Sequence, residues 1–152
     1  MQTGEMKWTK MARKVASRFM IAALVLYGLL FALDRKFPDK FYECEQDTND
    51  LGGGVKTFDG RRFNIVLCGT GGDENRMNDK IRLQIFSESG ELLAQRKFYV
   101  DWMMTNWPSK LEYGPAYLAY YDASQQDNYE HRISMPPTWW DWVRARLPLL
   151  NS

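Results

Sequence analysis

Residues 80–100 read KIRLQIFSESGELLAQRKFYV, and this stretch decides the fold of the chain. From Ile81 to Ile85 every second residue is apolar, which is the pattern of a strand with one buried face. A second alternating run begins after Gly90 and continues to Val100, with Arg96 as a charged exception on its apolar side. The stretch therefore predicts an antiparallel hairpin.

A similar pattern extends on both sides of this hairpin. Asp59-Gly60 lies between two runs of strand-forming residues, and both central residues of a tight hairpin turn need positive φ, which these two residues tolerate. Residues 117–121 and 129–135 predict two further strands. Thr138 and Asp141 form a variant capping box at the start of a short helix that Pro148 ends. The fold class is α+β: a small antiparallel β-rich domain with a short C-terminal helix.

Residues 15–36, VASRFMIAALVLYGLLFALDRK, carry the strongest signal for location. Phe19 to Leu33 contains no charge, and as a helix it would extend roughly 22 Å, short of the ~30 Å hydrocarbon layer. Residues 15–17 close the gap if Arg18 extends toward the headgroups. We therefore expect a single transmembrane helix, with a cleaved signal peptide and a buried core helix as the alternatives. Leu33 and Asp34 stand where a signal cleavage site needs small residues, and a cluster of cations is atypical of the start of a core helix.

Charge predicts the orientation of this anchor. Five cations and one acid precede Asp34, so the remainder of the chain is net negative although the whole chain carries +1. Positive flanks stay on the cytoplasmic side, which places the body of the protein in the periplasm of a bacterial inner membrane. The expected division is a basic cytoplasmic segment (1–14), the anchor (15–33), a stalk and irregular loop (34–54) and a periplasmic β-rich domain (55–152).

Cys44 and Cys68 both fall in the outward part of the chain. An oxidising compartment would let them form one disulfide, worth ~3 kcal/mol in the chain-entropy model. The alternative is two unrelated buried thiols. These two cysteines and the lone His131 supply too few ligands for a metal site.

The sequence contains no group of residues with the types and spacing of a known catalytic site. We therefore expect a protein without enzymatic activity and without a cofactor. His131 is the only histidine, and no nucleophile elbow surrounds a serine. The glycines of CGTGGDEN (68–75) lack the lysine of a phosphate-binding loop. The acidic stretch ECEQDTND (43–50) lacks calcium-loop spacing and predicts a solvated loop. The net negative body also disfavours nucleic acid as a partner.

Aromatic residues supply the candidate binding site. Tryptophan and tyrosine, together with arginine, dominate binding hot spots because they bury a large area at low rotamer cost. In residues 117–121 one face should point outward, and three tryptophans within four positions cannot share one buried helical stripe. A membrane-interface role for the helix is the rival explanation. The residues expected to contact a protein partner are Tyr120, Tyr121, Trp139, Trp140, Trp142 and Arg144.

Six segments carry a resemblance to known proteins: YGLLFAL (27–33), FYECE (41–45), TFDGRRFNIVLCGTGG (57–72), IRLQIFSESGELLAQRKFYVDW (81–102), LEYGPAYLAYYD (111–122) and ISMPPTWWDWVRARLPLL (133–150). Together they resemble small inner-membrane-anchored bacterial proteins associated with type VI secretion loci. That resemblance implies an immunity protein that binds and occludes an antibacterial effector toxin in the periplasm. The alternative is a structural accessory subunit of an envelope or secretion complex.

Overall fold

The computed structural model describes residues 16–29, 32, 39–71, 79–103, 110–125 and 127–147. The chain divides into two compact units, Met1–Pro38 and Asp39–Ser152, and each is treated separately below.

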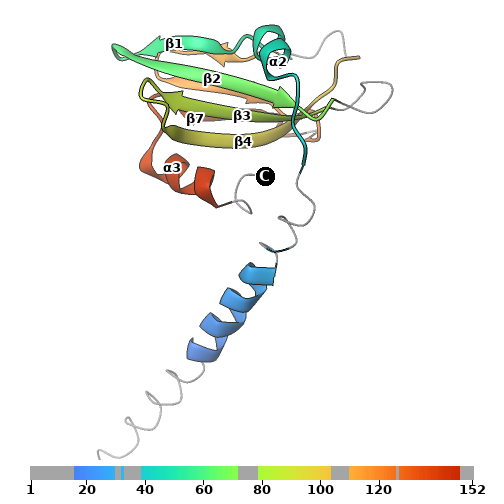
Figure 1. Cartoon of the computed structure of the whole chain (residues 1–152), viewed down its shortest axis with the longest axis vertical. Coiled ribbons are helices and arrows are strands. Elements are labelled where there is room, and N and C mark those ends of the chain that lie inside the picture. The colour runs from blue at the N-terminus through green and yellow to red at the C-terminus, as the bar shows by residue number, and fades with distance from the viewer. Residues whose placement is uncertain are drawn as a thin grey trace, which may run out of the picture. The chain divides into compact units, whose positions relative to one another are not determined.

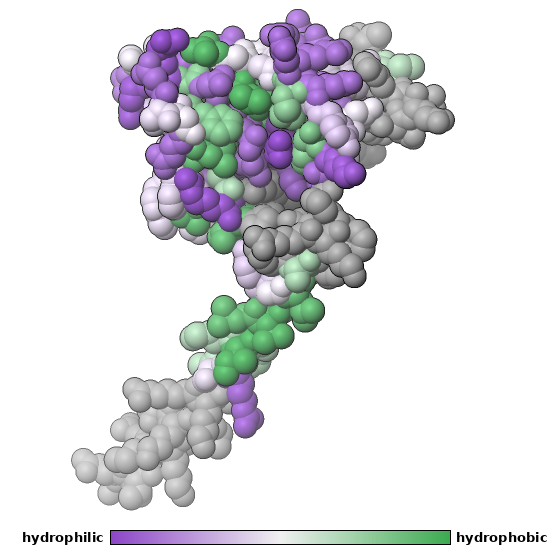
Figure 2. All heavy atoms as spheres, in the orientation of Figure 1, coloured by the Kyte–Doolittle hydropathy of each residue, from purple (hydrophilic) through white to green (hydrophobic). Residues whose placement is uncertain are grey.

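The described part of the first unit is a helix over residues 16–29, together with residue 32. Its side chains are exposed and mostly apolar, as with Phe19 and Leu24, which are 74% and 64% exposed (Figure 2). Within the described residues, no helix combines the length and the hydropathy that crossing a membrane requires. Leu30, Phe31 and Leu33 of the expected anchor lie outside the described residues, so the anchor remains a prediction.

The second unit contains a four-stranded antiparallel sheet in the order β1-β2-β3-β4 (Figure 1). Its strands are β1 (Gly54–Phe58), β2 (Arg61–Gly69), β3 (Asp79–Ser87) and β4 (Leu92–Val100). Asp59 and Gly60 both have positive φ at the first turn, which confirms that hairpin. The hairpin of residues 80–100 is confirmed as well, and β3 alternates buried and half-buried residues as its sequence predicts.

A second antiparallel sheet, in the order β5-β6-β7, packs on one face of the first (Figure 1). It consists of β5 (Glu112–Tyr113), β6 (Tyr117–Tyr121) and β7 (Glu130–Ser134). The core lies between the two sheets, where Phe98 of β4 packs against Tyr120 of β6 with ring centroids 4.9 Å apart. The described second unit is therefore α+β with an antiparallel two-layer core, as the sequence predicted in outline.

Two short helices complete this unit, α2 (Cys44–Asp50) and α3 (Trp139–Arg146). The helix α3 begins at the predicted cap, Thr138. The helix α2 replaces an expected irregular loop, and its Asp47 is 6% exposed where the sequence predicted solvated acids. A helix of two turns is marginal alone, so contacts with β2 stabilise it. One of these contacts is the predicted disulfide between Cys44 and Cys68, which is confirmed.

Candidate interaction surface

The helix α3 is fixed at its first turn by a reciprocal capping box. The Asp141 amide donates to Thr138 Oγ1 at 3.2 Å, and Asp141 Oδ2 accepts from the Thr138 amide at 2.9 Å. These bonds satisfy amide groups that have no partner within the helix. The residues of α3 and its cap therefore fix where the helix begins and how its first turn is oriented.

The same carboxylate joins α3 to the sheet. Asp141 Oδ1 accepts a hydrogen bond from the Arg96 guanidinium of β4, and the two residues are only 8% and 7% exposed. Burial disfavours the charged carboxylate, but the bonds from Thr138 and the charge of Arg96 outweigh it and hold the pKa of Asp141 below its ordinary value. Arg96, the exception in the apolar pattern of β4, thus has a structural partner.

A second set of contacts attaches Trp142 and Arg146 of α3 to the turn between β3 and β4. The Trp142 indole Nε1 donates to Glu91 Oε1 at 2.8 Å, and the Arg146 guanidinium lies 3.6 Å from the centroid of the Trp142 ring. Arg146 also donates to the Leu92 carbonyl at 3.1 Å. Trp142 and Arg146 therefore attach the helix to this turn, and the role of Trp142 in binding a partner stays a prediction.

Two tryptophans remain on the outside of this rigid helix. Trp139 and Trp140 are 71% and 57% exposed, and their ring centroids lie 5.9 Å apart. An open cavity of about 270 Å³ adjoins Trp139 and is lined by Leu93, Pro137, Thr138, Trp139 and Trp142. The prediction that at least one tryptophan of this helix is exposed is confirmed. We call Trp139 and Trp140 the tryptophan pair.

The expectation that Tyr120 or Tyr121 is exposed is wrong, because both are 8% exposed. Tyr120 faces the first sheet and also stacks on His131 with ring centroids 5.3 Å apart, and burial raises its pKa. Tyr121 points away from that sheet and lies against Tyr129, with ring centroids 6.1 Å apart. Burial, together with a hydrogen bond to Glu112, raises the pKa of Tyr121 to about 12. In this structure neither tyrosine is available to a partner.

The remaining predicted residue, Arg144, lies half-buried on α3. His131 is the residue on which an enzymatic reading would depend, and its Nε2 is buried without a hydrogen-bond partner among the described residues. Its ring neighbour is Tyr120, whose pKa is raised by burial. Within the described ranges, no three His, Cys, Asp or Glu side chains come together as metal ligands.

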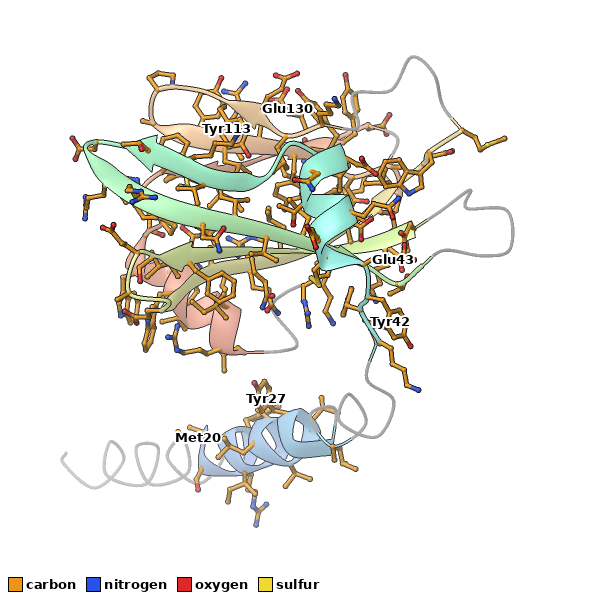
Figure 3. All side chains as sticks on the ribbon, turned by 45° about the horizontal axis from the view of Figure 1, so that its top comes forward. Met20, Tyr27, Tyr42, Glu43, Tyr113 and Glu130 are labelled. Atoms are coloured by element: carbon orange, nitrogen blue, oxygen red, sulfur yellow. A yellow bond between two sulfur atoms is a disulfide. The ribbon has the colours of Figure 1, made fainter. Side chains whose placement is uncertain are left out.

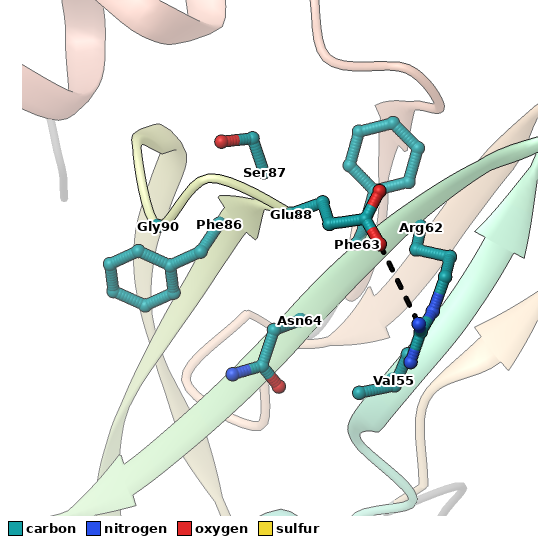
Figure 4. Close-up of a pocket in the computed structure, with 8 residues that line it drawn as sticks. All are labelled: Val55, Arg62, Phe63, Asn64, Phe86, Ser87, Glu88 and Gly90. Carbon is teal, nitrogen blue, oxygen red and sulfur yellow. Dashed lines mark ion pairs between the residues drawn. The ribbon is translucent and has the colours of Figure 1, made fainter.

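A separate groove of about 440 Å³ lies over β1, β2 and the end of β3 (Figure 4). Exposed Val55, Asn64 and half-buried Phe86 line it. Arg62 and Glu88 form an ion pair of 3.5 Å at its side, and both side chains are more than half exposed. An exposed ion pair of this kind contributes little energy, and the lining contains no nucleophile with a neighbouring base. We therefore assign no catalytic or binding role to this groove.

Comparison of the chain with protein-family models, with curated proteins and with solved structures found no match.

Proposed function

We propose that this protein is a membrane-tethered, non-enzymatic binding protein whose contact surface is the tryptophan pair. The observation that carries the proposal is the exposure of Trp139 and Trp140, 71% and 57%, on a helix held from two sides. Large apolar side chains exposed together are typical of surfaces that bind a partner.

The rigidity of this surface supports the proposal energetically. The capping box, the buried pair of Arg96 with Asp141 and the bond from Trp142 to Glu91 fix α3 before any partner arrives. A preorganised surface loses little conformational entropy on binding. Two aromatic side chains that each bury about 150 Å² would contribute roughly 7 kcal/mol before the costs of association.

The proposed tether is the transmembrane helix of residues 15–33, with the second unit in the periplasm. The exposed apolar side chains of residues 16–29 and the cations before Phe19 favour this placement. The confirmed disulfide also favours an oxidising compartment. An anchored binding protein is concentrated where an incoming cell-envelope toxin acts.

For the partner we propose an antibacterial effector toxin, which the protein would occlude as an immunity protein. The proposal rests on the resemblance of the six segments to proteins of type VI secretion loci. A deletion strain should then be killed by kin cells that carry the same locus, and the full-length chain should restore survival.

The decisive arm of this experiment uses the variant Trp139→Ala/Trp140→Ala. We expect this variant to fold, because both side chains are exposed, and to fail to restore survival. Val55→Ala is the matched control, since Val55 is 56% exposed on β1 and lies outside the tryptophan pair. In titration calorimetry with the purified toxin, each tryptophan substitution should weaken binding by about 2 kcal/mol.

Survival of the deletion strain beside attacking kin would refute the immunity role. If the chain then co-purified with stable envelope subunits, and the tryptophan variant abolished that association, the accessory role would replace it. Full protection by the tryptophan variant would refute the assignment of the contact surface.

A further inference from the structure

The edge of β2 is completed by a segment that is not a strand. The pairing of β1 with β2 ends at Gly54 and Ile65, so β2 continues to Gly69 without β1 beside it. Thr48 of α2 fills part of this edge: its Oγ1 accepts from the Leu67 amide at 2.9 Å and donates to the Leu67 carbonyl at 3.2 Å. The end of α2 is fixed further by Leu51, whose side chain is fully buried.

The residues before Asp47 are attached to the same edge at Tyr42 and at Cys44. The Tyr42 amide donates to the Gly69 carbonyl at 2.7 Å, and Cys44 is bonded to Cys68. Further back, Lys80 and Lys97 contact Asp39 at 2.8 and 3.2 Å, and Arg82 lies 4.5 Å from the Phe41 ring centroid. Partly exposed ion pairs of this kind contribute little. We call residues 39–46 the strap.

Glu43 lies between the two main attachments of the strap, Tyr42 and Cys44, and Figure 3 labels it beside Tyr42 where the chain enters α2. It has φ of 50°, in the left-handed region that favours glycine, and its side chain makes no cap bond to α2. Such a conformation is unfavourable for a residue with a side chain and persists only where its surroundings enforce it. The Tyr42 bridge on one side and the Cys44 disulfide on the other provide that enforcement.

We propose that the disulfide is a redox latch: its reduction releases the strap from the β2 edge while the sheets stay folded. With Cys44 free, Glu43 can relax to an ordinary backbone conformation, and the Tyr42 bridge together with the partly exposed contacts of Asp39 and Phe41 does not hold the strap. Thr48 and Leu51 keep the following turn in place. The released segment begins at Asp39, where the second unit begins.

The chemistry of opening balances with a dithiol as the reductant. A thiolate of the dithiol attacks the half-buried Cys44 sulfur in preference to Cys68, which is 2% exposed, and the Cys68 thiolate leaves. The second thiol of the reductant resolves the mixed disulfide. Two electrons and two protons are transferred, which leaves two cysteine thiols and an oxidised reductant.

Release of the strap would lengthen the connection between the two units. Eight extended residues span at most about 27 Å at ~3.4 Å per residue. If the tether of the proposed function is correct, the redox state sets how far the tryptophan pair reaches from the membrane. The latch itself does not depend on the tether, and it is tested on the purified full-length chain in detergent.

The test is residue-resolved amide hydrogen exchange in the oxidised and dithiol-reduced protein. The Tyr42 amide, bonded to Gly69, and the Asp47 amide, bonded to the Glu43 carbonyl, should exchange about tenfold faster or more after reduction. The Leu67 amide, bonded to Thr48, and the Leu111 amide, bonded to the Leu51 carbonyl, should keep their rates. Unchanged exchange at Tyr42 and Asp47, or an equal increase at all four amides, would overturn the proposal.

A matched pair of variants tests the role of the strained residue. Glu43→Gly removes the penalty of the left-handed conformation, so its reduced form should keep the slow exchange of the oxidised protein at Tyr42. Glu45→Gly, an exposed position within α2, should give no such protection. Equal behaviour of the two variants would show that strain at Glu43 does not drive release, and would overturn the latch as proposed.

Discussion

Removal of the Asp141 carboxylate should destabilise the second unit strongly. In Asp141→Ala, Arg96, which is only 7% exposed, loses its counter-ion, although its guanidinium still donates to the Gln95 carbonyl. Breaking one side of a buried ion pair costs about 3–5 kcal/mol, and loss of the cap at Thr138 adds roughly 1 kcal/mol. The sum, about 5 kcal/mol, is comparable to the whole stability of a small domain.

The assay is urea unfolding of the purified protein at neutral pH, followed by tryptophan fluorescence. Arg96→Met/Asp141→Ala should recover most of the loss, because no buried charge remains and methionine fills similar space. The control is Arg132→Ala, which removes an exposed ion pair with Glu130 and should cost less than about 0.5 kcal/mol. A loss below 1 kcal/mol in Asp141→Ala, or a double variant no more stable than that single variant, would refute this account of the pair.

Three further predictions concern Asp47, the pH dependence of Asp141 and the glycine that lies beside Asp47. Burial, the charge of Asp79 and nearby acids raise the pKa of Asp47 in the folded protein. Its ionisation therefore lowers the free energy of unfolding as the pH rises through the folded-state pKa. In urea unfolding, Asp47→Asn should be more stable than wild type at pH 7, and the difference should shrink toward pH 4. Asp141 has a lowered pKa in the folded protein, so its ionised carboxylate stabilises the fold at pH values above its unfolded-state pKa. This stabilisation is lost as the pH falls through the folded-state pKa. Urea unfolding of the Asp47→Asn variant should still show that loss on acidification. Gly69→Ala would place a Cβ 2.4 Å from Asp79 Oδ2 and 2.8 Å from Asp47 Oδ2, and should cost about 1–3 kcal/mol in the same assay; a neutral result would contradict the close packing of these carboxylates.

The features that the sequence predicted correctly depend on neighbours a few residues apart. The Asp59-Gly60 turn, the alternation in residues 80–100 and the cap formed by Thr138 and Asp141 each require only local geometry. The disulfide was predictable for another reason, since the chain offers one possible intramolecular pair.

The features that were missed depend on contacts between distant segments. Arg96 was visible only as a break in a pattern, because its partner Asp141 lies 45 residues later. Tyr120 and Tyr121 were expected to include an exposed residue, yet β6 has both of its faces covered. The helix α2 has weak intrinsic preference and forms because the edge of β2 binds Thr48 and Asp47, which no local pattern reveals.

The double use of Asp141 has a consequence for synthesis. The ribosome synthesises β4 well before α3, so Arg96 of a nascent chain has no counter-ion until Asp141 has been added 45 residues later. Products that end before α3 lack both the counter-ion and the two exposed indoles. The segment 138–146 thus supplies at once the counter-ion that Arg96 needs and the tryptophan pair of the proposed recognition surface.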